Sequence, residues 1–105
     1  MTWAPSWGWA SGNMISTLED MRVWARLFAG GELFSTERKV ERDRFLSAPG
    51  EGEGALYGLG VEYQNGWIGH NGNTLSYMAY PYYLPAEGIT MVTSYLQTYA
   101  PAASR

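Results

Sequence analysis

The chain has 105 residues, which suits one small domain or a piece of a larger one. Hydrophobic residues make up 46% and charged residues 16%, a composition typical of globular rather than disordered protein. The net charge of −3 argues against a nucleic-acid partner, and the lack of cysteine excludes disulfides and thiolate sites. No apolar run approaches the roughly 18 residues of a membrane-spanning helix, so no membrane span is expected.

The N-terminal third predicts one clear helix after an irregular start. Three tryptophans, at positions 3, 7 and 9, have no periodicity, so we expect an extended segment that lies on some other surface. Ser16 to Glu19 fits a Ser-x-x-Glu capping box, and apolar residues then recur at helical spacing until Gly30-Gly31. This pattern predicts a helix at about 17–29.

A second, weaker helix is expected at about 36–46, capped by Ser35. Its run "ERKVERDR" mixes charges, and spacing predicts the pairs Lys39 with Asp43 and Glu41 with Arg44. Such a run is typical of a solvated helix face.

From about residue 55 to 96 the pattern is that of β-strands. Asn65-Gly66 is a type I′ hairpin signal, and residues 85–88 predict a second turn. Pro81 is expected only at an edge, a bulge or a strand break. The predicted fold class is α+β, with two helices followed by an antiparallel meander of four strands.

Few residues offer catalytic or metal-binding chemistry. One histidine and no cysteine make a metal site unlikely on ligand spacing, and no cofactor is expected. Thr36 stands three residues before the only lysine, Lys39, so the chain contains no Ser-x-x-Lys pair for serine acyl-enzyme chemistry. Tyr63 to Asn65 could suggest a Tyr-x-Asn element, but the Asn-Gly turn accounts for the asparagine.

Several segments, in order, resemble the C-terminal part of serine β-lactamase-like proteins: the class C β-lactamases, the D-alanyl-D-alanine carboxypeptidases and related esterases. They are "SGNMISTLEDMRVWARLFAGGELFS", "YGLGVEY", "GHNGNT" and "PAEGITMVTSYLQ", which together span about residues 8–97. No single motif is specific alone; their order and spacing carry the resemblance. It implies that residues 1–105 are a C-terminal part of a β-lactamase/transpeptidase-like domain.

The resemblance also implies roles for the segment around the histidine. His70 takes the place of the lysine in the family's Lys-Thr-Gly strand, beside the nucleophile. Asn71 stands where a hydroxyl residue usually binds the substrate carboxylate, which puts that recognition in question. Gly72 would let substrate approach the strand, and the backbone N–H of Asn73 would form half of an oxyanion hole. On the residues alone, His70 can equally be a turn residue.

The same resemblance implies what the chain lacks and where its parent acts. The nucleophile, its lysine and the Tyr-x-Asn loop would precede this sequence, so the chain alone is expected to be inactive and to self-associate through exposed strand edges or apolar faces. The parent would be an extracytoplasmic enzyme acting on peptidoglycan-like peptides, β-lactams or esters.

Two other functions remain open from the sequence. Trp3, Trp7, Trp9 and Trp67 could stack on sugar rings in a small carbohydrate-binding module. An autonomous enzyme using the ten acidic residues ranks last, because none of them forms a recognisable acid–base pair.

Overall fold

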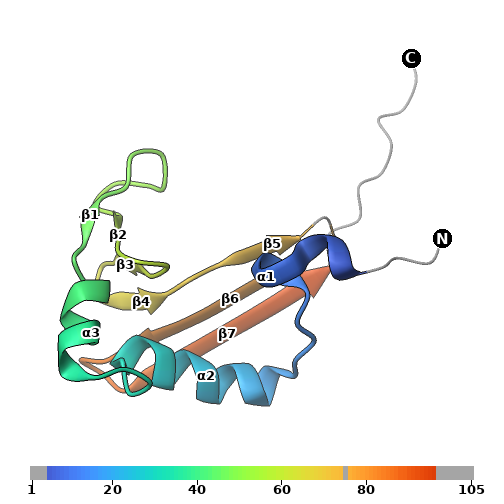
Figure 1. Ribbon diagram of the computed structural model, residues 1–105, viewed down its shortest axis with the longest axis horizontal. Coiled ribbons are helices and arrows are strands. Elements are labelled where there is room, and N and C mark those ends of the chain that lie inside the picture. The colour runs from blue at the N-terminus through green and yellow to red at the C-terminus, as the bar shows by residue number, and fades with distance from the viewer. Residues whose placement is uncertain (1–4, 75, 97–105) are drawn as a thin grey trace.

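The computed structural model describes residues 5–74 and 76–96 (Figure 1). In this part of the chain three α-helices precede one antiparallel sheet of seven strands, which confirms the α+β class. A 3₁₀ turn, η1 (Pro5–Gly8), is followed by α1 (Trp9–Gly12), α2 (Leu18–Gly30) and α3 (Thr36–Arg42). The strands are β1 (Leu46–Ser47), β2 (Leu56–Tyr57), β3 (Glu62–Gln64), β4 (Trp67–Gly69), β5 (Gly72–Thr74), β6 (Tyr77–Leu84) and β7 (Ile89–Leu96).

The N-terminal segment is not extended as predicted. Residues 5–12 form η1 and α1, and Trp9 has the positive φ of 41° where the two meet. Gly12 lies close to the Thr74 side chain, so α1 rests against the end of β5. Local hydrogen bonding, such as that from Ser11 Oγ to the Gly8 carbonyl at 2.6 Å, favours the helical turns over an extended form. Trp3 lies outside the described residues.

Helix α2 is the predicted helix, but its cap is one residue later than expected. Thr17 Oγ1 accepts a hydrogen bond from the Asp20 N–H at 3.1 Å, so the capping box based on Ser16 is wrong. At the other end Gly31 has φ 70°, and its N–H reaches the last carbonyls of the helix. The predicted glycine stop is confirmed.

Helix α3 ends at Arg42, not at residue 46. The chain leaves the helix because Leu46–Ser47 pairs with β2 as an edge strand, a pairing that the charge pattern could not show. Lys39 contacts Asp43 at 2.6 Å as predicted. Glu41 pairs with Arg38 at 2.9 Å instead of with Arg44.

Arg42 corrects the expectation that this charged run is wholly solvated. Its side chain is 5% exposed, and its Nε donates to Asp43 Oδ1 at 2.7 Å. The guanidinium also donates to the carbonyls of Phe28 and Ala29, at the C-terminal end of α2. A cation there satisfies carbonyls that have no partner in their own helix and meets the negative end of the helix dipole. Arg42 therefore joins α3 to α2.

The sheet is organised around β6, which pairs with β7 on one side and with β4 and then β5 on the other. The last pair between β4 and β6 is Gly69 with Tyr82, and the first pair between β5 and β6 is Gly72 with Ala79. Two residues of each strand line, 70–71 and 80–81, lie between these two pairs. The register is thus continuous through the gap. β4 and β5 follow one line, which is one reason why the predicted count of four strands is too low.

Pro81 explains the gap, although it is not at an edge, a bulge or a break of its own strand. It is buried within β6, paired with Val92 of β7, and faces residue 70 on the other side. Because proline has no N–H, it cannot complete a ladder at this point. The predicted strand break is therefore found not in β6 itself but next to it, between β4 and β5, which pair with β6 on either side of Pro81.

Helix α2 lies along β6 and β7 (Figure 1), with Ala25 and Ala29 buried. The buried apolar residues of the described chain are few and mostly small: Ala25, Ala29, Ala55, Val61 and Met78. Many large apolar side chains stay exposed, among them Ile15 at 92% and Leu96 at 66%. Among the described residues, no helix has the length and apolar character needed to cross a bilayer.

We predict that Arg42→Met destabilises the protein by about 2 kcal/mol, since it leaves the Phe28 and Ala29 carbonyls without their donor, while Asp43 keeps only its ion pair with Lys39. Urea unfolding followed by circular dichroism measures the change. Arg38→Met is the matched control on the same helix, because Arg38 is 74% exposed and its ion pair is worth at most about 0.5 kcal/mol. Equal effects of the two substitutions would contradict the capping role of Arg42.

Candidate functional site

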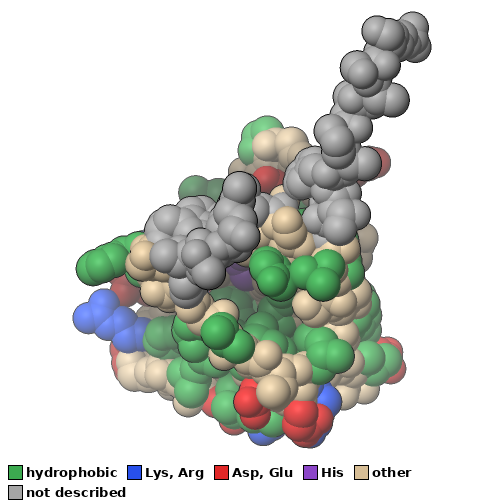
Figure 2. All heavy atoms as spheres, turned by 90° about the vertical axis from the view of Figure 1, so that its right-hand side faces the viewer, with side chains coloured by type: hydrophobic (Ala, Val, Ile, Leu, Met, Phe, Trp, Pro, Cys, Tyr) green, Lys and Arg blue, Asp and Glu red, His purple; other side chains and the backbone are tan. Residues whose placement is uncertain are grey.

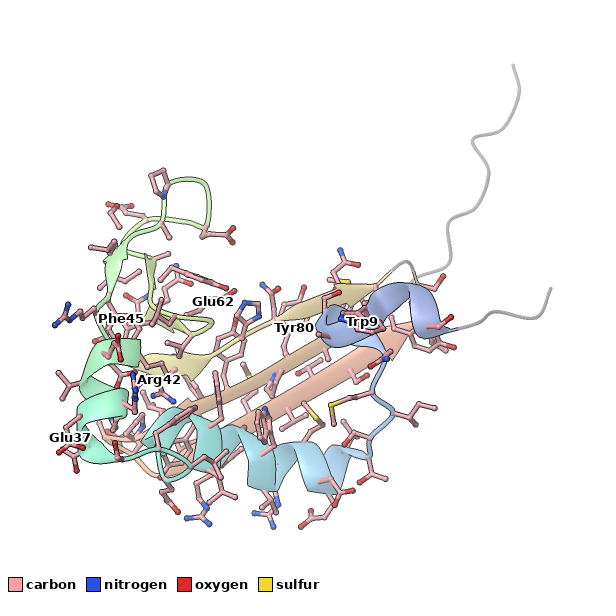
Figure 3. All side chains as sticks on the ribbon, viewed as in Figure 1. Trp9, Glu37, Arg42, Phe45, Glu62 and Tyr80 are labelled. Atoms are coloured by element: carbon pink, nitrogen blue, oxygen red, sulfur yellow. The ribbon has the colours of Figure 1, made fainter. Side chains whose placement is uncertain are left out.

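A row of residues crosses the sheet on one face, from β2 to β7. Tyr57 pairs with Glu62, Glu62 with Gly69, Gly69 with Tyr82 and Tyr82 with Met91. Direct cross-strand partners share a face, so these side chains point the same way. Tyr80, two residues from Tyr82, lies on this face too. Figure 3 shows Glu62 and Tyr80 on the side of the sheet away from α2.

Gly69 leaves the space that lets two of these side chains meet. A Cβ built at Gly69 would lie 2.6 Å from Cδ1 of the Tyr82 ring, and would also overlap the Pro81 carbonyl oxygen. The Tyr82 ring therefore passes over the bare backbone of β4. Its hydroxyl donates to Oε2 of Glu62 on β3. Any larger residue at this position would block that bond.

His70 is held at both ring nitrogens. Nδ1 lies 2.5 Å from the Asn71 carbonyl oxygen, which can only accept, so Nδ1 carries a proton. In the neutral ring Nε2 is then the acceptor, and it lies 2.6 Å from the Tyr57 hydroxyl, which donates to it. Glu62 Oε1 is 4.0 Å from the same Nε2. The neutral histidine is thus bound to Tyr57, and a protonated one would face the Glu62 carboxylate.

The backbone of β5 faces an open edge next to the histidine. Gln64 and Trp67 close a two-residue turn, so they form a hydrogen-bonded pair of the β3–β4 ladder. Such pairs alternate along an antiparallel ladder, so Glu62 and Gly69 form the next one. The N–H and C=O of Gly69 therefore point toward β3. Every second residue points the same way, so the N–H groups of Asn71 and Asn73 point away from β6. In the described residues β5 pairs only with β6. The Asn73 N–H is therefore directed at the open edge.

The structure thus brings the predicted residues together at one strand gap. His70 and Asn71 occupy the gap, while Gly72 and Asn73 begin β5. A Cβ placed on Gly72 would meet nothing within 4 Å, so the space beside it is free within the described chain. His70 is not part of a hairpin turn; the turn before it is formed by Asn65 and Gly66, with φ of 51° and 88°, as predicted.

A groove of about 450 Å³ lies on the face that carries Glu62 and Tyr82. The sheet forms its floor, and the loop between β1 and β2 forms one wall through Ala48, Glu51 and Ala55. Its remaining lining comes from Leu56, Tyr57, Glu62, Tyr63, Gln64, Asn65, Trp67, Asn71, Tyr80, Tyr82 and Met91. The groove is rich in aromatic rings and adjoins the gap that holds His70.

Two phenol groups on this face, those of Tyr80 and Tyr82, are poor acids. Burial raises the pKa of Tyr82, and its hydrogen bond to the Glu62 carboxylate raises it further, as does the negative charge of Glu62 and Glu51. The neighbouring Tyr95 phenol is the main cause that raises the pKa of Tyr80, and the two rings stack at 6.1 Å. Both tyrosines therefore remain protonated hydrogen-bond donors at neutral pH.

Three members of this cluster, Tyr57, Glu62 and Tyr82, were missed by sequence reasoning. Tyr57 belongs to the "YGLG" segment, which was noted only as a strand start, and nothing local links it to residue 70. Glu62 and Tyr82 meet only through the sheet register. The Asn-Gly turn was the one available signal, because it aligns residue 62 with residue 69.

Of the tryptophans considered for sugar stacking, the two whose side chains the structure describes, Trp9 and Trp67, do not form one platform. Trp67 lines the groove at the start of β4, whereas Trp9 lies on α1, which contacts the far end of β5 (Figure 3). Seven residues separate Trp67 from Thr74, a span of about 23 Å along a strand. A single sugar ring cannot bridge them.

No group of three or more potential metal ligands occurs among the described residues. Comparison of the chain with models of protein families, with curated proteins and with solved structures finds no match in any of the three.

We predict that Gly69→Ala costs about 1–3 kcal/mol, because the added methyl collides with the Tyr82 ring and the Pro81 carbonyl. Gly72→Ala on β5 is the control, since its methyl enters free space and should change stability little. Urea unfolding of both variants provides the test. A neutral Gly69→Ala would show that Tyr82 does not pass over β4.

Stability should fall at alkaline pH. The pKa of Tyr82 is raised in the folded protein above the ordinary tyrosine value of about 10, so its contribution to stability is complete below about pH 10 and is lost as the pH rises toward the folded value. Urea midpoints between pH 8 and pH 11.5 measure the loss. Tyr82→Phe should have a shallower alkaline decline than the wild type, and an unchanged decline would contradict the burial of this phenol.

Proposed function

We propose that the chain is the C-terminal portion of a serine hydrolase of the β-lactamase/D-alanyl-D-alanine carboxypeptidase family. It would supply the His-x-Gly strand and one oxyanion-hole amide to an active site completed by other parts of the protein. The observation that carries the proposal is the Asn73 N–H, directed at an open strand edge beside a histidine whose orientation is fixed at both ring nitrogens.

The geometry suits a wall of an acyl-transfer site. A backbone N–H at an open edge can donate to the oxygen of a tetrahedral intermediate, provided that a second donor comes from the nucleophile's own residue. His70 Nε2 accepts from the Tyr57 hydroxyl and could accept from a substrate group in its place, with Glu62 Oε1 at 4.0 Å from the same nitrogen. Asn71 presents an amide where the family usually has a hydroxyl, so its side-chain N–H groups would be the donors toward a substrate oxygen at this position.

The exposed apolar surface supports an incomplete domain. Met14 and Ile15 are 91% and 92% exposed, and Leu96 at the end of β7 is 66% exposed. Figure 2 views the molecule from the right-hand side of Figure 1, where α1, the start of α2 and the end of β7 come together. Hydrophobic side chains gather on this face. Further protein packed here would bury them, and without it the chain would self-associate.

The proposed parent is extracytoplasmic and takes a peptidoglycan-like peptide, a β-lactam or an ester as substrate. The chain itself contains no Ser-x-x-Lys pair, and its Tyr63-Gln64-Asn65 sequence lies at the end of β3 and in the hairpin turn. It would therefore not be acylated by a β-lactam on its own.

The reading frame upstream of the Met1 codon tests this proposal. We expect it to encode, in frame, a Ser-x-x-Lys element followed by Tyr-x-Asn. In the extended protein, His70→Ala should lower kcat/KM for p-nitrophenyl esters by about 100-fold or more, because it removes a proton-handling group of the site. Glu87→Gln, in the exposed turn after β6, is the control and should leave the rate unchanged.

A stop codon or unrelated sequence upstream would contradict the proposed parent. An extended protein whose esterase rate survives His70→Ala would contradict the role of the histidine. Labelling of the 105-residue chain by a fluorescent penicillin would also count against the proposal, since the chain would then hold its own nucleophile.

A further inference from the structure

The groove beside His70 carries charge of one sign. Glu51 and Glu62 are the charged residues of its lining, which contains no lysine or arginine among the described residues. Five aromatic residues surround them: Tyr57, Tyr63, Trp67, Tyr80 and Tyr82. Aromatic ring faces are electron-rich and attract cations. Carboxylates and ring faces together favour a positive ligand and repel a negative one.

Glu62 has an oxygen available for such a ligand. Its side chain is 19% exposed, and Oε2 accepts from the Tyr82 hydroxyl. Oε1 lies 4.0 Å from the nearest histidine nitrogen, beyond hydrogen-bond distance, so its lone pairs are free for another donor. The bond from Tyr82 holds the carboxylate in place across Gly69. The acceptor is thus positioned before any ligand arrives.

Glu51 adds a second charge from the opposite wall. It lies in the exposed loop between β1 and β2 and lines the groove. Glu51 and Glu62 both line the groove, so the two carboxylates border the same space. A cation between them would interact with both.

We propose that this groove binds the ammonium group of a small organic cation, with Glu62 as its hydrogen-bonding partner, Glu51 as a second charge and the tyrosine and tryptophan rings as walls. A volume of about 450 Å³ accommodates an alkyl or aryl amine. The groove requires no nucleophile, so ligand binding to it can be tested without the proposed hydrolase activity. In a complete hydrolase it would select substrates that carry an amine.

NMR titration of the ¹⁵N-labelled 105-residue chain tests the site with three probes of similar size: n-butylammonium, n-butanol and butyrate. We expect saturable shifts at the Trp67 indole N–H and at residues lining the groove with butylammonium, and at least tenfold weaker binding of the other two. Glu62→Gln should weaken butylammonium binding at least tenfold, and Glu51→Gln about threefold. Glu53→Gln, in the same loop but outside the lining, is the matched control and should bind as the wild type does.

Equal binding of butanol and butylammonium would overturn the proposal, because the groove would then recognise only apolar surface. Saturable shifts with N-acetylglucosamine but not with butylammonium would also overturn it, in favour of carbohydrate binding. If Glu62→Gln disturbs the fold, Glu51→Gln still tests the proposal, because Glu51 is exposed. Wild-type affinity of that variant for butylammonium would contradict the charge mechanism. None of these outcomes depends on the upstream reading frame, so this site and the proposed function can fail separately.

Discussion

The missing amide hydrogen of Pro81 is the constraint on which the candidate site depends. A strand residue with an N–H would let β4 and β5 join in one uninterrupted ladder along β6. With proline at this position, residues 70 and 71 remain in register but are not locked into the sheet. The Asn71 carbonyl, which points away from β6, accepts from His70 Nδ1, and this bond fixes the protonated nitrogen of the ring.

A second feature of the site is that its polar groups bind one another. Tyr82 holds Glu62, Tyr57 holds His70, and Glu62 faces His70 at a distance too long for a hydrogen bond. Both proposals use this carboxylate. A cation bound at Glu62 would reduce its attraction for a protonated His70, so ligand binding and the charge of the histidine would oppose each other.

Local signals in the sequence were enough for the fold class, the main helix and the turns at residues 65–66 and 85–88. These features depend on residues close together in the chain, such as a cap, a glycine stop or an Asn-Gly pair. The failures came where distant residues decide. Arg42 was assigned to a solvated face because the α2 carbonyls that bury it lie 13 and 14 positions earlier.

The candidate site was predicted in the same partial way. The segment 70–73 was singled out through its resemblance to a known strand motif, and its role stays a prediction. Its partners could not be found, since Tyr57, Glu62 and Tyr82 approach His70 only when four strands pair in one register. The groove could not be predicted either, because its wall, the loop between β1 and β2, has no sequence pattern of its own.

The strand order has a consequence for how this protein folds. Every strand pairs with a neighbour in sequence, and only β4 with β6 skips a strand, so the sheet closes through short loops that cost little chain entropy. Docking of α2 on β6 and β7 brings together residues that are about fifty or more positions apart in the sequence. It is therefore the folding step with the longest-range contacts. The groove lies within residues 48–91, entirely inside the meander and its loops. Its assembly therefore belongs to the more local part of the folding reaction and does not depend on the docking of α2.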